Sequence, residues 1–85
     1  MTDEARESSR EAALLEFVAR ELVAEPDAVV VTEQQDGDFH KLHLQVAEAD
    51  VGKVIGRNGR IAKAIRALLK VVATRDGTKV NLEID

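Results

Sequence analysis

The residues with the clearest chemistry in this sequence are two glycines three positions apart, Gly56 and Gly59, with cationic and amide side chains around them. Glycine permits positive φ angles and lets another backbone approach closely. Arg57, Asn58 and Arg60 would surround an anion placed at this point. A helix that begins just after the second glycine would add free N–H groups and the positive end of its dipole. This combination suits a phosphodiester backbone.

Further cations lie on both sides of this loop. Lys53 and Lys63 flank it, and from Lys53 to Arg75 the sequence has seven Lys or Arg residues and no acid. Residues 1–50 have a charge balance of −9 and residues 51–85 one of +5, within a net charge of −4. A cationic helix on its own is usually an ordinary solvated face. Beside a Gly-x-x-Gly loop, the asymmetry favours a basic, nucleic-acid-binding face on an acidic domain.

The sequence around the loop predicts two helices that hold it in place. A short helix is predicted over about residues 50–55 and a long one over about residues 59–75, ended by Asp76-Gly77. Apolar residues at steps of four, three and four are expected to form the buried stripe of the long helix: Ile61, Ile65, Leu68 and Val72.

An N-terminal helix is predicted over about residues 8–24, as a structural element covering one face of a sheet. Ser8 followed by Glu11 matches a capping box, and Ser9 is a rival cap. Glu11 is expected to face water, and Pro26 ends the helical segment. Residues 1–7 lack an apolar anchor, so they are expected to be a disordered acidic extension of a single domain that spans residues 8–85.

Three further stretches have the composition of strands. Residues 28–32 are β-branched, residues 39–46 and 78–85 alternate between apolar and polar, and Asp36-Gly37 marks a hairpin turn. The element order is therefore α-β-β-α-α-β. The first two strands pair antiparallel, and the third lies parallel to the second after a two-helix crossover. This order predicts an α+β domain with a three-stranded mixed sheet and three helices on one face.

The loop and the topology together resemble a known family. Val-Ile-Gly-Arg-Asn-Gly-Arg-Ile, residues 54–61, resembles the signature of KH domains, whose Gly-x-x-Gly loop clamps about four nucleotides of a single strand. The element order is that of the type II KH fold. The stretch from Gly52 to Arg66, with Leu-x-x-x-Pro-Asp-Ala-Val at residues 22–29, resembles the small bacterial single-KH proteins of the KhpA type. The similarity extends from about Leu15 to the C-terminus.

The resemblance implies an RNA-binding protein that acts with a larger KH-containing partner or as a homodimer, as a post-transcriptional regulator or RNA chaperone. The RNA backbone is expected against the loop, with cations attracting phosphates and an apolar groove floor receiving bases. The expected RNA-binding residues are Gly56, Arg57, Asn58, Gly59, Arg60, Lys53, Lys63, Val54, Ile55 and Ile61.

Few residues in the sequence support any other kind of site. His40 and His43 would lie on opposite faces of a strand, so no metal site is expected, and no cofactor or small-molecule substrate is implied. No base is arranged with a nucleophile, so an enzyme is not expected. The absence of cysteine and of a long apolar run favours a cytoplasmic protein without a membrane segment. The alternative function is a KH-shaped pairing module with little RNA binding of its own.

Overall fold

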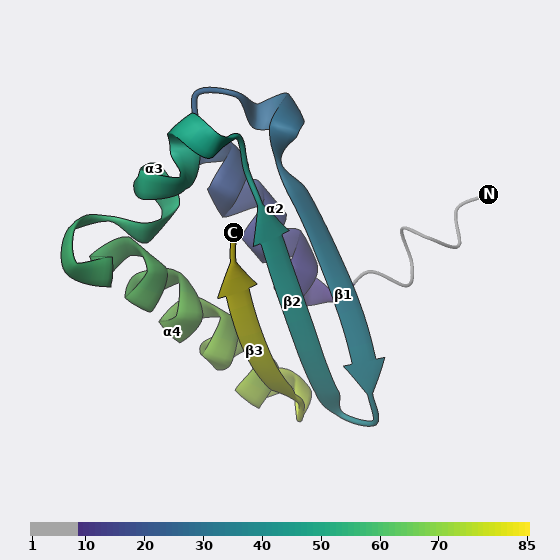
Figure 1. Cartoon of the computed structure of the whole chain (residues 1–85). Coiled ribbons are helices and arrows are strands. Elements are labelled where there is room, and N and C mark those ends of the chain that lie inside the picture. Colours follow the sequence, from purple (N-terminus) through teal and green to yellow (C-terminus); the bar gives the residue numbers. More distant parts are fainter. Residues whose placement is uncertain (1–8) are drawn as a thin grey trace.

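The computed structural model describes residues 9–85 and arranges them in two layers (Figure 1). Three helices cover one face of a three-stranded sheet: α2 (Arg10–Leu22), α3 (Val51–Ile55) and α4 (Arg60–Asp76). The strands are β1 (Val30–Asp36), β2 (Phe39–Gln45) and β3 (Lys79–Ile84). Short 3₁₀ turns precede β1 and α3 and join α3 to α4. The predicted fold class and element order are confirmed.

The sheet has the order β1-β2-β3, with β2 in the centre. β1 pairs antiparallel with β2 from Val30↔Gln45 to Asp36↔Phe39, which leaves a two-residue turn between them. β3 pairs parallel with β2, as the crossover rule predicts. The expected bounds of the first strand, residues 28–32, were wrong at both ends. A 3₁₀ turn at Pro26–Ala28 delays the strand, and cross-strand hydrogen bonds extend it through polar residues to Asp36.

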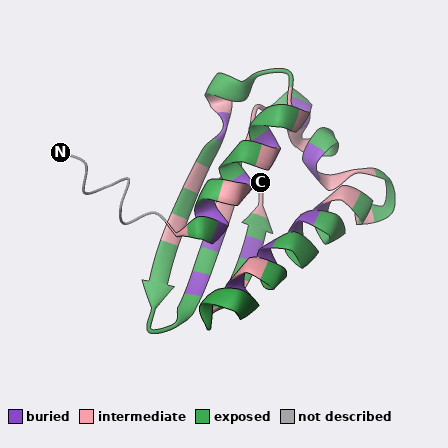
Figure 2. Ribbon diagram, turned by 180° about the vertical axis from the view of Figure 1, so that it is seen from behind, coloured by how far each residue is buried: buried purple, intermediate pink, exposed green. Residues whose placement is uncertain are grey.

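The core lies between the helices and the sheet, where the buried positions of each element meet (Figure 2). Leu42 and Leu44 of β2 are completely buried, with Leu15 of α2, Val54 of α3 and Leu69 of α4 packed into the same cluster. The alternation predicted for the second strand is confirmed, since both leucines face the helices. Because α3 and α4 share this core, the loop between them is held on a rigid base.

The buried stripe of α4 differs by one register from the prediction. Leu68 was expected in the core, but it is 50% exposed, whereas its neighbour Leu69 is 1% exposed. The buried positions are Ala62, Ile65, Leu69 and Ala73, at steps of three, four and four. Both registers have helical spacing, so periodicity alone could not separate them.

The start of α2 agrees with one of the two predicted caps, but the burial of Glu11 differs from the prediction. Ser9 is the N-cap, and its hydroxyl oxygen accepts a hydrogen bond from the Ala12 N–H at 3.0 Å. The other predicted cap, Ser8, lies outside the described residues, as does the predicted boundary between the extension and the domain. Glu11 was expected to face water and is instead 1% exposed. It lies four residues before Leu15, and therefore on the helix face that points into the core.

Within residues 9–85, no helix is both long enough and apolar enough to cross a bilayer. The two histidines lie on opposite faces of β2, as expected. His40 is buried beneath α2, where its Nδ1 contacts Glu33 Oε2, and His43 Nε2 lies 2.9 Å from Asp85 Oδ2 on the other face.

Candidate nucleic-acid interface

Gly56 ends α3 and begins the loop, at φ 78° and ψ 171°. A Cβ atom at this position would lie 2.7 Å from Ile61 Cγ1 and 2.9 Å from Ile61 N. Both distances are far inside normal contact, so only glycine lets the first turn of α4 come this close. The close backbone approach made possible by Gly56 is therefore internal, and it packs the loop against the helix that follows.

Asn58 and Gly59 form the exposed bend of the loop. Asn58 has φ 57° and ψ 25°, and Gly59 has φ 73° and ψ 16°, so two consecutive residues are left-handed. Asparagine is one of the few side chains that tolerate this conformation. A Cβ atom on Gly59 would meet nothing within 4 Å, so this glycine is favoured by its backbone angles alone. The N-cap of α4 is Gly59, so the Asn58 side chain does not cap this helix.

The N-terminus of α4 opens directly onto this bend. No side chain caps it, and its first turn contains no acidic residue. The helix has 17 residues, and the positive end of its dipole lies where the loop turns. The N–H groups of Gly59 and Arg60 are already bonded within this turn, to the carbonyl groups of Gly56 and Arg57. Backbone geometry therefore creates an anion-attracting end before any charged side chain is considered.

Three of the predicted cationic residues surround the loop with exposed side chains: Arg57, Arg60 and Lys63. Within residues 9–85, no ion pair is formed by any of the three. Their charges are consequently available to an anion from outside the chain. They lie on the loop and on the first turn of α4, so the structure brings them together as the sequence predicted.

Lys53 has a different setting from the other predicted cations. Its Nζ lies 3.0 Å from Oδ1 of the buried Asp50, whose Oδ2 accepts from the Glu25 N–H at 3.1 Å. The hydrogen bond from Lys53 holds the pKa of Asp50 below its usual value, with the backbone N–H groups of Ala24 and Glu25 acting in the same direction against the effect of burial. This cluster ties α3 to the segment after α2. The charge of Lys53 is partly neutralised by it.

The predicted apolar residues divide into two groups. Val54 is completely buried in the core, so it has no surface to offer a base. Ile55 and Ile61 are half-buried and flank the loop on its two sides, at the end of α3 and in the first turn of α4. The apolar surface next to the loop is therefore smaller than the sequence suggested.

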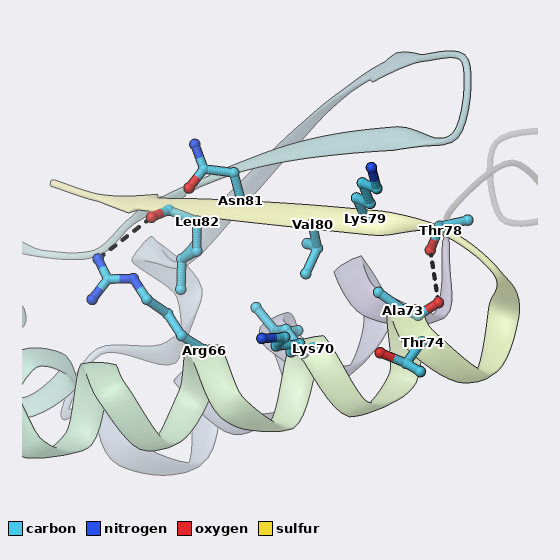
Figure 3. Close-up of a pocket in the computed structure, with 10 residues that line it drawn as sticks. Arg66, Lys70, Ala73, Thr74, Thr78, Lys79, Val80, Asn81 and Leu82 are labelled. Carbon is cyan, nitrogen blue, oxygen red and sulfur yellow. Dashed lines mark hydrogen bonds between the residues drawn. The ribbon is translucent and has the colours of Figure 1, made fainter.

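A groove that sequence reasoning did not assign runs between α4 and β3 (Figure 3). It has a volume of about 330 Å³ and begins at Arg66, seven residues after Gly59, which is about two helical turns. Its lining from α4 includes Arg66, Lys70 and Thr74, and its lining from the other side includes Thr78, Val80 and Leu82. The sequence feature that could have indicated this groove is the spacing of Lys63, Arg66 and Lys70, which continues the basic face along the helix.

The free edge of β3 forms one wall of this groove. The N–H groups of Lys79 and Asp85 donate to carbonyl groups on the β2 side, at 2.8 and 2.9 Å. The groups of Val80 and Leu82, at intervening positions, therefore point to the free edge. Arg66 Nη2 reaches the Leu82 carbonyl at 3.4 Å from across the groove. Groups at the free edge of a sheet can hydrogen-bond to an added chain or to bases, and the Leu82 carbonyl already accepts from Arg66.

The chain is similar in sequence to a described family of KH domains. The sequence profile of the family described as "KhpA/KhpB, KH domain" matches residues 12–84. The protein named RNA-binding protein KhpA from Clostridium acetobutylicum is 48% identical over 71 residues, which cover 84% of this chain and 95% of that relative. The protein of the same name from Borreliella burgdorferi is 42% identical over 79 residues, covering 93% of this chain and 96% of that relative.

The fold also occurs in a larger solved protein. The crystal structure of Aquifex aeolicus Era bound to GDP and AlF4⁻ matches with a TM-score of 0.62 and 23% identity, over 87% of this chain and 29% of that protein. This similarity concerns the fold alone. The relatives above are RNA-binding proteins rather than enzymes, in agreement with the expectation that this chain is not an enzyme. By the match over residues 12–84 and the identity to these relatives, the chain belongs to the KhpA/KhpB family of KH domains.

Proposed function

We propose that this protein binds short single-stranded RNA at the Gly56–Gly59 loop and the adjoining groove. The observation that carries the proposal is the left-handed bend at Asn58 and Gly59 in front of the uncapped start of α4. Exposed Arg57 and Arg60 lie beside it. A backbone-built anion site next to a groove of about 330 Å³ suits a phosphate chain whose bases turn to one side. The names of the relatives support RNA as the ligand.

The binding mode that we expect follows from the residues that line the loop and the groove. Phosphates would lie against the bend at the positive end of the α4 dipole and be attracted by Arg57, Arg60 and Lys63. Bases would contact Ile55 and Ile61 and the edge of β3. The sequence has only two aromatic residues, and both lie away from the loop, on α2 and at the hairpin. Without aromatic stacking, each base gains little energy, so we expect weak binding with a short sequence preference.

The test is a fluorescence anisotropy titration with an unstructured RNA of about eight nucleotides, at low salt. We expect saturable binding in the micromolar range or weaker, because few phosphates are contacted. Unlabelled single strand should compete, whereas a perfect duplex of the same sequence should compete poorly. No saturable binding at low salt would overturn the proposal.

One loop of this kind holds about four nucleotides, which is too short a sequence to identify a transcript. We therefore propose that the protein acts as a homodimer or with a larger KH-containing protein, because two linked sites raise the effective concentration. A role as a regulator or RNA chaperone in the cytoplasm is part of this proposal, as is a domain spanning residues 8–85. Light scattering that gives a monomer, together with no KH-containing partner in a cell pull-down, would contradict the pairing.

A second candidate function rests on exposed apolar side chains. Phe17 on α2 is 64% exposed, and Leu68 and Val71 on α4 are 50% and 57% exposed. Such residues favour protein contacts when they gather on one surface. A protein that pairs strongly but shows no RNA binding in the titration above would make pairing the principal function.

A further inference from the structure

The first turn of α2 contacts the corner between α4 and β3 through two adjacent residues. Arg10 Nη1 lies 2.9 Å from Asp76 Oδ1, an ion pair on the surface. Thr78 Oγ1 donates to Glu11 Oε2 at 2.8 Å, beneath that surface. Glu11 is 1% exposed, so its carboxylate is a buried group that the RNA-binding site described above does not use.

This corner forms one end of the groove between α4 and β3. The Thr78 N–H donates to the Ala73 carbonyl at 2.8 Å, and the Thr78 hydroxyl lies 3.3 Å from the same oxygen (Figure 3). Thr78 and Ala73 both line the groove, with Val80 two residues further along β3. The position of Thr78 therefore sets where β3 leaves α4, and the Glu11 carboxylate holds Thr78 from the other side.

A buried carboxylate contributes little net stability to a fold, because burial removes its hydration. Its desolvation is unfavourable, and the hydrogen bond from Thr78 Oγ1 and the N-terminus of α2 act against this cost. Replacing buried ionic groups by apolar side chains of similar volume is often neutral or stabilising. A methionine at position 11 would continue the apolar face that includes Leu15 and Ala19. The carboxylate therefore contributes position rather than stability.

We propose that Glu11 is a positioning residue for RNA binding, which acts through Thr78 to hold the end of the groove at the width that admits a base. This inference rests on the proposed function. Glu11 itself does not touch RNA. It fixes one wall of the groove from inside the protein.

Charge and position predict opposite results when this carboxylate is removed. By charge alone, Glu11→Met should strengthen the binding of a polyanion, because one negative charge is lost. If Glu11 acts by positioning Thr78, the same change should weaken RNA binding by about three- to tenfold, the range of one lost hydrogen bond. Glu16→Met is the matched control, since Glu16 is an exposed carboxylate on the same helix, paired only with Arg20 at 3.4 Å among the described residues.

The experiment measures RNA affinity and thermal melting on the same samples of the full chain. We expect Glu11→Met to bind RNA more weakly than Glu16→Met while its melting temperature is equal to or above that of the wild type. Glu11→Gln keeps an oxygen that can accept from Thr78, so its affinity should be restored to within about twofold of the control. A purely structural role would instead make affinity follow stability across the series.

A second variant tests the contact from its other end and does not depend on the folding of Glu11→Met. Thr78→Val removes the hydroxyl at nearly constant volume, and by itself it should weaken RNA binding by about the same three- to tenfold. When it is combined with Glu11→Met, the two effects on affinity should not add, because both remove one interaction. Additive effects would overturn the inference. If the wild type binds RNA but Glu11→Met binds as tightly as Glu16→Met or more tightly, the inference fails and the proposed function stands. If the wild type binds no RNA, both fail.

Discussion

At the scale of single residues, the loop depends on backbone conformation as much as on charge. Gly56 is required by its contact with Ile61, and Gly59 only by its positive φ. Asn58 occupies a left-handed position that most side chains avoid. Arg57 carries exposed charge and has no role in the core. The loop therefore contains residues that build its shape and one, Arg57, whose exposed charge would attract the proposed ligand.

We predict that Arg57→Asp with Asn58→Asp weakens RNA binding by more than about tenfold, because carboxylates would face phosphates beside the uncapped helix end. Aspartate also tolerates the left-handed region, so unfolding free energy should change by no more than about 0.5 kcal/mol. Lys41→Asp with Gln45→Asp is the matched control, since it makes the same change of −3 at exposed positions of β2. Equal losses of affinity in the two variants would mean that the loop is not the site.

The two glycines should differ in how much stability they contribute. Gly59→Ala should cost about 1–2 kcal/mol, the cost of a left-handed alanine. Gly56→Ala should cost more, about 3 kcal/mol, because overlap with Ile61 adds to an unfavourable backbone conformation. Urea denaturation measures both. A Gly56→Ala variant no less stable than Gly59→Ala would contradict the close packing of the loop on α4.

At the scale of elements, buried polar contacts tie the helices to the sheet and to one another. Burial by itself would raise the pKa of Glu33, but hydrogen bonds from His40 and Ser9 outweigh it and hold that pKa below its usual value. These contacts join β1, β2 and the start of α2. The Asp50 cluster does the same for α3 and the segment after α2, and the pKa of Asp50 is lowered chiefly by Lys53.

These lowered pKa values predict acid sensitivity. A carboxylate whose pKa is lower in the folded state stabilises the fold fully above its unfolded pKa, and this stabilisation is lost as the pH falls. For Glu33 the loss should begin near pH 4.5, its ordinary pKa, and continue below it. We expect Glu33→Gln to be less stable than the wild type at pH 7 and to lose less stability on acidification. Urea denaturation at pH 7 and pH 4 measures this difference, and equal losses would refute the prediction.

At the scale of the whole molecule, a chain with a net charge of −4 presents a basic face. The acids of residues 9–50 lie mainly on α2, β1 and the connecting turns, whereas the cations of residues 51–75 lie on α3, the loop and α4. A polyanion can therefore approach from the loop side while the remainder of the surface repels it. For the RNA binding that we propose, this asymmetry would limit how many phosphates are contacted and would orient the strand along α4.

We predict that RNA affinity depends moderately on salt. Contact with two to four phosphates gives a slope of about −1.4 to −2.8 for the logarithm of the binding constant against the logarithm of salt concentration. Arg60→Gln should reduce the magnitude of the slope by about 0.7, the value for one phosphate. Titrations between about 50 and 200 mM salt measure both. A binding constant that does not change with salt would contradict a phosphate-based site.

The sequence by itself determined the element order, the mixed sheet and the location of the loop. Periods of two and of three to four residues identify strands and helices, and Gly56, Gly59 and the acid-free basic run are local signals that need no tertiary information. The loop cations also came together as expected, because they are close along the chain. For the same reason, the family resemblance could be recognised from residues 52–66.

The tertiary structure alone decided which side of each helix is buried and what lies between distant elements. Periodicity did not separate Leu68 from Leu69. It also predicted that Glu11 faces water, because its hydrogen-bond partner Thr78 is 67 residues away and leaves no local signal. The groove needs α4 beside the free edge of β3, which no local pattern encodes. Contacts between residues far apart in the chain depend on how the elements pack, and packing is set by the shapes of all the side chains together.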